Sequence, residues 1–253
     1  MTIARTHPIQ TGELIARGIY PSGINIQVLG ERGSVGPGLE VDMTPIGAGF
    51  PAVATAAAAF QVASSSANDA SPAGTGILTV RVISLDATLE LQSEDVALSG
   101  VAAVALLQAR AILDVFALTV GTGGAAAGAI TVAETVSGIA HRVIGQGRRR
   151  QRDCYTVIPA GLSGIVRSMG GPFGSSIASY ILTANRAPMA VGSDVAALTA
   201  VRYGLAAAPA TGSYPLDPPQ RFAAGCVVGV ACNNETAGSQ LVASSMGITL
   251  ERL

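Results

Sequence analysis

The sequence contains no tryptophan and no lysine, and it is poor in charge of either sign. Aromatic residues make up only 4% of its 253 residues, so a core must be built from Val, Ile, Leu and Ala. Charged residues make up 12%, about half the share found in ordinary soluble domains. A monomer with so few charges would expose an unusually apolar surface, and large apolar patches usually mark partner contacts. The composition therefore favours a chain packed against other subunits, with a very stable secreted or thermophilic monomer as the alternative.

The chain also lacks an excess of charge of one sign. All 15 basic residues are arginine and the formal net charge is −1, so the overall charge attracts neither nucleic acid nor a membrane surface. The first residues include Arg5 and Arg17 and have no apolar run of a secretory signal. The charge-free stretch 43–68 contains Pro45 and Pro51, which do not suit a membrane-spanning helix. We expect no membrane association and no direct contact with nucleic acid.

Residues that could do chemistry are few and scattered. His7 and His141 lie far apart in the sequence, and neither has a Cys, Asp or Glu at ligand spacing, which argues against a metal or acid–base role. Glu90, Glu94 and Asp95 crowd one predicted hairpin, where paired carboxylates could suit a glycosidase. The chain has little aromatic surface for a sugar to stack on. We therefore expect no enzymatic activity, no catalytic residue, no cofactor and no metal.

A glycine-rich loop at 121–126 superficially resembles a dinucleotide-binding fingerprint. That motif works only when a helix starts at the glycines, because the helix N-terminus holds the pyrophosphate. Strand-forming residues 129–132 follow here instead. The pattern favours a glycine loop that closes a hairpin between 113–120 and 130–132.

Three cysteines, Cys154, Cys226 and Cys232, form an odd set without metal-ligand spacing. If 226–231 is a strand, Cys226 and Cys232 are roughly 20 Å apart at about 3.3 Å per residue, too far for a disulfide. We expect three free, buried thiols.

Short apolar alternations separated by turn residues predict an all-β chain. The clearest is a hairpin in which 77–83 alternates, 86–88 turns, and 89–92 returns until 93–95 interrupt it. This arrangement is typical of sandwiches and jelly rolls. Further strands are expected within 24–29, 53–62, 102–107, 113–120, 130–132, 155–161, 164–169, 177–183, 197–203, 226–231 and 241–250.

We divide the chain into an N-terminal arm, 1–24, and two antiparallel, jelly-roll-like β-sandwich modules, 25–145 and 146–253. The arm is either a disordered terminus or a segment that orders on a neighbouring subunit. The module boundary falls where Gln, Gly and Arg concentrate, from residue 145 onward.

The only notable charge cluster lies at this boundary and comprises Arg148, Arg149, Arg150 and Arg152. It is either a solvated loop between two sheets or a surface that docks on an acidic partner. Four arginines without interleaved aromatic residues are weak support for nucleic-acid binding. We keep the four arginines as candidate interface residues.

Several segments combine small-residue loops with short strands. They read SSSANDASPAGTGILTVRVISLDATLELQSEDVALSGVAAV (64–104), GTGGAAAGAITV (121–132), YTVIPAGLSGIV (155–166), YPLDPPQRF (214–222) and SSMGITLERL (244–253). These segments, in order over about 24–253, resemble uncharacterised structural proteins of tailed-bacteriophage virions, of the capsid-decoration or head/tail-associated β-sandwich type.

The resemblance implies a non-enzymatic virion component assembled in the bacterial cytoplasm. Its partners would be the major capsid protein or other virion proteins, and the chain would be a homo-oligomer. The expected role is that of a decoration, cement or head-spike protein that bridges or caps shell subunits. A tail or neck protein, or a receptor- or glycan-binding module, remains the alternative.

Overall fold

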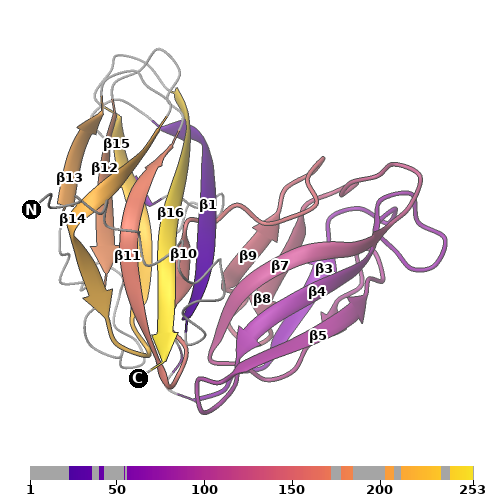
Figure 1. Ribbon diagram of the computed structural model, residues 1–253. Helices are drawn as coiled ribbons and strands as arrows, with labels where there is room; N and C mark the ends of the chain where they lie inside the picture. The colour runs from indigo at the N-terminus through magenta and orange to yellow at the C-terminus, as the bar shows by residue number, and fades with distance from the viewer. Residues whose placement is uncertain are drawn as a thin grey trace, which may run out of the picture.

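The computed structural model describes residues 23–35, 40–42, 54, 56–171, 178–184, 203–207, 212–234 and 240–252. These residues form two β-sandwiches that lie side by side (Figure 1), and every pair of neighbouring strands is antiparallel. The all-β fold predicted from the alternation is confirmed. Within the described ranges, no helix is long and apolar enough to cross a membrane. The expected arm lies outside the described residues up to position 22.

One sandwich is built from two separate parts of the chain, and we call it the split sandwich. Its two sheets enclose a cluster of buried aliphatic and sulfur-containing side chains. The first sheet has the order β1 (Gly23–Val35), β16 (Gln240–Arg252), β11 (Leu162–Gly171), β14 (Gly212–Phe222). The second has the order β10 (Tyr155–Val157), β15 (Val227–Asn234), β12 (Ala178–Ala184), β13 (Tyr203–Ala207), with β2 (Glu40–Asp42) also on β15.

The other sandwich lies between β2 and β10 in the sequence, and we call it the inserted sandwich. One sheet has the order β6 (Val104–Ala105), β3 (Phe60–Ser64), β8 (Ile130–Glu134), β9 (Ala140–Ile144). The opposite sheet has the order β5 (Leu91–Ala97), β4 (Ile77–Leu85), β7 (Ala111–Val120).

The strand pairing divides the chain differently from the expected modules. β1 pairs with β16 along most of its length, and β2 pairs with β15. Residues 23–35 and 40–42 therefore belong with the C-terminal strands, whereas the first module was expected to span 25–145. An apolar alternation shows which face of a strand is buried, but it carries no information about which strand lies next to it. The local pattern could not reveal that the first strand closes on the last.

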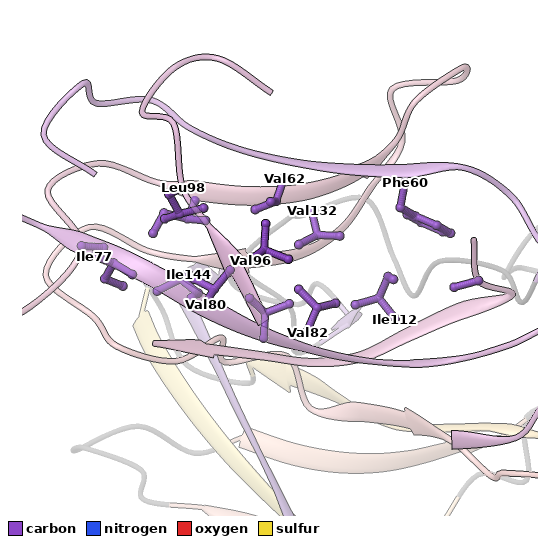
Figure 2. Close-up of a cluster of buried hydrophobic side chains, with 14 residues drawn as sticks. Phe60, Val62, Ile77, Val80, Val82, Val96, Leu98, Ile112, Val132 and Ile144 are labelled. Atoms are coloured by element: carbon purple, nitrogen blue, oxygen red, sulfur yellow. The ribbon is translucent and has the colours of Figure 1, made fainter. Parts of the chain in front are cut away.

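The inserted sandwich has an aliphatic core drawn from both of its sheets (Figure 2). On β4, Val80 and Val82 are fully buried, as the period of two predicts. Ile77 is also fully buried, although simple alternation from Val80 would place it on the outer face. Register shifts between β4 and β7 at 77–80 mark a bulge that turns Ile77 inward. Burying each such side chain contributes roughly 1.5–3 kcal/mol.

The predicted hairpin is present as β4 and β5, but β5 continues through the residues expected to interrupt it. β5 is an edge strand whose outer face is in water, so polar side chains are tolerated there. Asp95 lies directly opposite Arg81, and its two oxygens accept hydrogen bonds from Nε at 2.6 Å and Nη2 at 2.8 Å. The polar run therefore stabilises the strand instead of ending it.

Two other strand predictions need correction. β8 pairs with β3 and β9, not with β7, so the glycine-rich loop crosses from one sheet to the other and closes no hairpin. The strand expected at 102–107 shortens to β6, and that expected at 197–203 lies outside the described residues except for its last position. In β16, Ser244, Met246, Ile248 and Leu250 are all buried on one face, as expected.

Candidate functional site

The small-residue loop 64–76 is organised by one buried carboxylate. Asp69 is fully buried, and Ser64 Oγ donates to its Oδ2 at 2.6 Å. The backbone N–H groups of Ile77 and Ala127 donate to Oδ1 at 2.7 and 2.9 Å, and that of Gly128 donates to Oδ2 at 2.9 Å. The carboxylate thus joins its own loop to the glycine-rich loop across the end of the sandwich.

These hydrogen bonds also control the ionisation of Asp69. Burial alone raises the pKa, but the bonds from Ser64, Ala127, Gly128 and Ile77 outweigh it, so the pKa lies below its usual range. The Asp69 side chain is ionised and links the two loops, and each of its carboxylate oxygens already accepts two hydrogen bonds. We assign it no catalytic role.

Close packing explains why the residues in these loops are small. A Cβ added at Gly76 would lie 2.0 Å from Asp69 Oδ1, and one at Gly128 would lie 2.6 Å from Ser65 Oγ and 2.7 Å from the Ser66 backbone nitrogen. β4 begins at this end and finishes at Leu85, which packs against Tyr155 of the split sandwich. The loops therefore lie at the end of the inserted sandwich that is remote from its neighbour (Figure 1).

The arginine-rich segment lies alongside β7 and adds an extra edge to the sheet that contains this strand. The N–H of Ala117 donates to the carbonyl of Arg149 at 2.7 Å, and the N–H of Gln151 donates to that of Val115 at 3.1 Å. Arg149 Nε donates to the Gly124 carbonyl. The segment is thus tied to the inserted sandwich rather than being a free linker.

The four candidate interface arginines have different surroundings. Arg148, Arg149 and Arg150 are exposed, and Arg152 is half-buried. Arg150 pairs with Asp114, and its guanidinium carbon lies 5.5 Å from the centre of the Phe116 ring. The charge of Arg150 is therefore balanced within the chain.

A cleft of about 380 Å³ lies where the two sandwiches meet. Its walls are mostly aliphatic and come from both sandwiches, with the Arg150–Asp114 pair and Gln151 among the polar groups that line it. Leu29 and Leu91 line the cleft and are 46% and 52% exposed. The contact between the sandwiches is therefore incompletely packed beside this cleft.

Next to the cleft is a buried polar cluster, which we call the joint: Arg142, Gln151, Asp153 and Tyr155. Arg142 is fully buried, and its guanidinium carbon lies 3.5 Å from the centre of the Tyr155 ring. Its Nε donates to the Ile112 carbonyl at 3.0 Å and its Nη2 to the Tyr155 carbonyl at 3.3 Å. Arg142 belongs to β9 and Tyr155 to β10, so the stack spans the two sandwiches.

Asp153 forms a buried ion pair with Arg142. Its Oδ2 is 3.6 Å from Arg142 Nη1, and both side chains are fully buried. Burial raises the pKa of Asp153 to about 6, and the charge of Arg142 together with hydrogen bonds from Arg142 and the Val143 backbone offsets only part of that rise. Burial likewise raises the pKa of the neighbouring Cys154 thiol to about 12. The free, buried state expected for all three cysteines is confirmed.

The other titratable residues named from the sequence have structural contacts. His141 Nε2 lies 3.0 Å from Glu134 Oε1, its ring packs edge-on against Phe60 at 4.8 Å, and burial lowers its pKa. Glu94 accepts the N–H of Leu107 at 2.7 Å, and Asp95 pairs with Arg81. In the described ranges, no group of three His, Cys, Asp or Glu residues could hold a metal ion. His7 lies outside those ranges.

Asp69 and the joint were missed from the sequence, although weak signals exist. Arg142 interrupts the apolar strand Ala-His-Arg-Val-Ile, and Asp153 directly precedes a buried run. A charged residue inside such a pattern suggests a buried partner, but the partner cannot be named from spacing alone.

Several large apolar side chains of the inserted sandwich are exposed. Val136 is 96% exposed in the turn between β8 and β9, and Ile139 is 54% exposed in the same turn. Among residues whose exposure the structure describes, Leu29 is an exposed large hydrophobic residue of the split sandwich. The full set is Leu29, Leu91, Val101, Leu107, Leu118, Val136 and Ile139.

Comparison with known proteins assigns no family. No family model matches the chain, and no curated protein matches it. Among solved structures, one similarity is to the structure of infectious bursal disease virus Gt strain, with 9% sequence identity and a TM-score of 0.15. That alignment covers 92% of this chain and 77% of the other. A TM-score this low carries no argument about fold or function.

Proposed function

We propose that this chain is a structural component of a tailed-phage virion, serving as a capsid decoration, cement or head-spike protein that bridges or caps shell subunits. The resemblance of its loop and strand segments to such proteins motivates the proposal. The observation that carries it is a charge-poor, all-β molecule that exposes large aliphatic side chains, among them Val136 and Ile139.

The exposed turn between β8 and β9 suggests which part of the molecule meets the shell. The exposed turn containing Val136 and Ile139 would be covered on docking, and each side chain would contribute roughly 1.5–3 kcal/mol once removed from water. Arg148 and Arg149 would add contacts to partner carboxylates, for which a guanidinium fork is well suited. The inserted sandwich would thus face the shell.

The chemistry of the described residues fits the alternative of a glycan-binding module less well. Such a module uses exposed aromatic rings as a platform for sugars. Phe60, Tyr155 and Phe222 are buried, and Phe116 is half-buried beneath Arg150. The aromatic side chains that the structure describes therefore provide no open platform.

The test is to count copies of the chain in purified particles of the phage that encodes it, using quantitative mass spectrometry. A shell protein should be present in hundreds of copies, whereas a dozen or fewer would indicate the tail or neck. Absence from the particle would overturn the proposal.

The role of the inserted sandwich in docking is tested by adding the purified chain back to particles that lack it and measuring its binding. The double variant Val136→Ser/Ile139→Ser should bind at least about 100-fold more weakly, since it loses roughly 3 kcal/mol or more of apolar burial. Leu29→Ser on the split sandwich is the matched control and should bind like the natural chain. The reverse result would place the contact on the split sandwich.

A further inference from the structure

The cleft between the two sandwiches has the size and the location of a small-molecule site. Its volume of about 380 Å³ lies within the roughly 300–1,000 Å³ of ligand pockets, which often form where two domains meet. Residues of β1 line it from the split sandwich, and residues of β4, β5 and β7 line it from the inserted sandwich. Fewer residues line it than the roughly 20–30 on each side of a standard protein–protein interface. The size of the cleft therefore favours a small ligand over a protein partner.

The walls of the cleft suit an aliphatic chain. Leu29 of the split sandwich and Leu91 of the inserted sandwich both line it, and each is about half exposed. Tyr155 is the aromatic residue of the lining, and the guanidinium of Arg142 already stacks on its ring. A flexible aliphatic chain can cover both leucines, whereas an aromatic ligand would find no open ring to stack on.

The polar side chains of the cleft offer donors and positive charge. Asp114 accepts hydrogen bonds from Nε and Nη2 of Arg150 and from Nε2 of Gln151. A guanidinium has five N–H groups, so Nη1 of Arg150 is left without a partner among the described residues, and this side chain is 64% exposed. Two arginines, Arg150 and Arg152, line the cleft with a single aspartate. The polar end of a matching ligand is therefore an anionic acceptor, for which a guanidinium is well suited.

We propose that the cleft binds a medium-length aliphatic carboxylate, with its chain between Leu29 and Leu91 and its carboxylate on Arg150. Removing the chain and the two leucines from water supplies the affinity, and the hydrogen bond from Arg150 fixes the orientation. The cleft would bind this ligand whether or not the chain belongs to a virion, so the two proposals can fail separately.

A titration of the methyl-labelled protein with octanoate at neutral pH, followed by NMR, tests the site. The methyl signals of Leu29 and Leu91 should shift along one saturable curve, while those of Val136, in the exposed turn outside the cleft, should stay in place. 1-Octanol has the same chain with a neutral head and should bind at least about tenfold more weakly, because hydrogen bonds between charged groups are stronger. Acetate lacks the chain and should not saturate the site.

Three variants separate the chain-binding wall from the head-binding arginine. Leu91→Asp places a negative charge in the cleft and should weaken octanoate binding at least about tenfold. Val136→Asp introduces the same charge outside the cleft and is the matched control, which should bind octanoate like the natural chain. Arg150→Met should weaken octanoate about tenfold and leave 1-octanol unchanged, a difference that a general loosening of the fold would not produce.

The absence of saturable shifts at Leu29 and Leu91 would overturn the proposal. Equal affinity for octanoate and 1-octanol would overturn the assignment of a carboxylate ligand. Octanoate binding that survives Leu91→Asp unchanged would show that the ligand sits elsewhere on the molecule.

Discussion

Replacing Asp69 by asparagine tests whether one carboxylate organises the remote end of the inserted sandwich. The substitution preserves the side-chain shape but leaves only one acceptor oxygen. In its better orientation the new amide nitrogen faces Ser64 Oγ, which can turn to accept, and the Gly128 N–H, which then has no acceptor. A buried donor without an acceptor costs about 1–3 kcal/mol, and the remaining hydrogen bonds lose their charge assistance. We expect Asp69→Asn to lower the free energy of unfolding by about 2–4 kcal/mol.

Urea unfolding followed by far-UV circular dichroism at pH 7 measures this loss. The matched control is Asp86→Asn in the turn between β4 and β5, where the carboxylate accepts bonds from Thr88 and Glu90 in contact with water. Asp86→Asn should lower the free energy of unfolding clearly less than Asp69→Asn does. The folded-state pKa of Asp69 is lowered, so its stabilisation is complete above the unfolded value of about 4 and disappears as the pH falls through the folded value. The difference between Asp69→Asn and the natural chain should therefore shrink below pH 4.

A loss below about 0.5 kcal/mol for Asp69→Asn would refute this reasoning, because surface substitutions without structural contacts have effects of that size. Equal losses for the two variants would also refute it, since they would show that burial of the carboxylate makes no difference.

Three further substitutions or reactions test other parts of the structure. Gly128→Ala should lower the free energy of unfolding by about 1–3 kcal/mol, because its Cβ would meet the loop backbone, and urea unfolding measures this. Arg142→Met should lower the free energy of unfolding by about 3 kcal/mol, because it leaves the buried Asp153 carboxyl without its cation. Arg150→Met removes one partner of an exposed ion pair and should lower it by only about 0–1 kcal/mol in the same assay. Ellman's reagent should leave Cys154 unreacted in the native protein at pH 8 and modify it on unfolding, since the thiol is buried and its pKa is about 12.

The strands themselves were largely predictable from the sequence, because burial on one face imposes a period of two. The alternation that begins at Ile77 predicts β4, and the turn at Asp86 predicts its hairpin with β5. The bulge that turns Ile77 inward could not be predicted, since it arises from register shifts against β7. Local patterns specify faces, whereas partners and bulges depend on residues far away in the sequence.

The candidate sites were less predictable than the strands. The arginine cluster is visible in the sequence, but its contacts with Gly124 and Asp114 depend on the docking of the segment along β7. Asp69 looks like an ordinary polar residue in a loop until the amides of another loop surround it. Arg142 and Asp153 lie in separate segments that meet only where the two sandwiches join.

The pairing of β1 with β16 has a consequence for how the protein is made. Gly23 pairs with Glu251, so the first strand leaves the ribosome long before its neighbour in the sheet exists. The strands of the inserted sandwich all lie between residues 60 and 144 and can assemble while synthesis continues. Until β16 has been synthesised, the hydrogen-bonding edge of β1 has no partner strand. The nascent chain is therefore most vulnerable to aggregation before synthesis of β16 is complete.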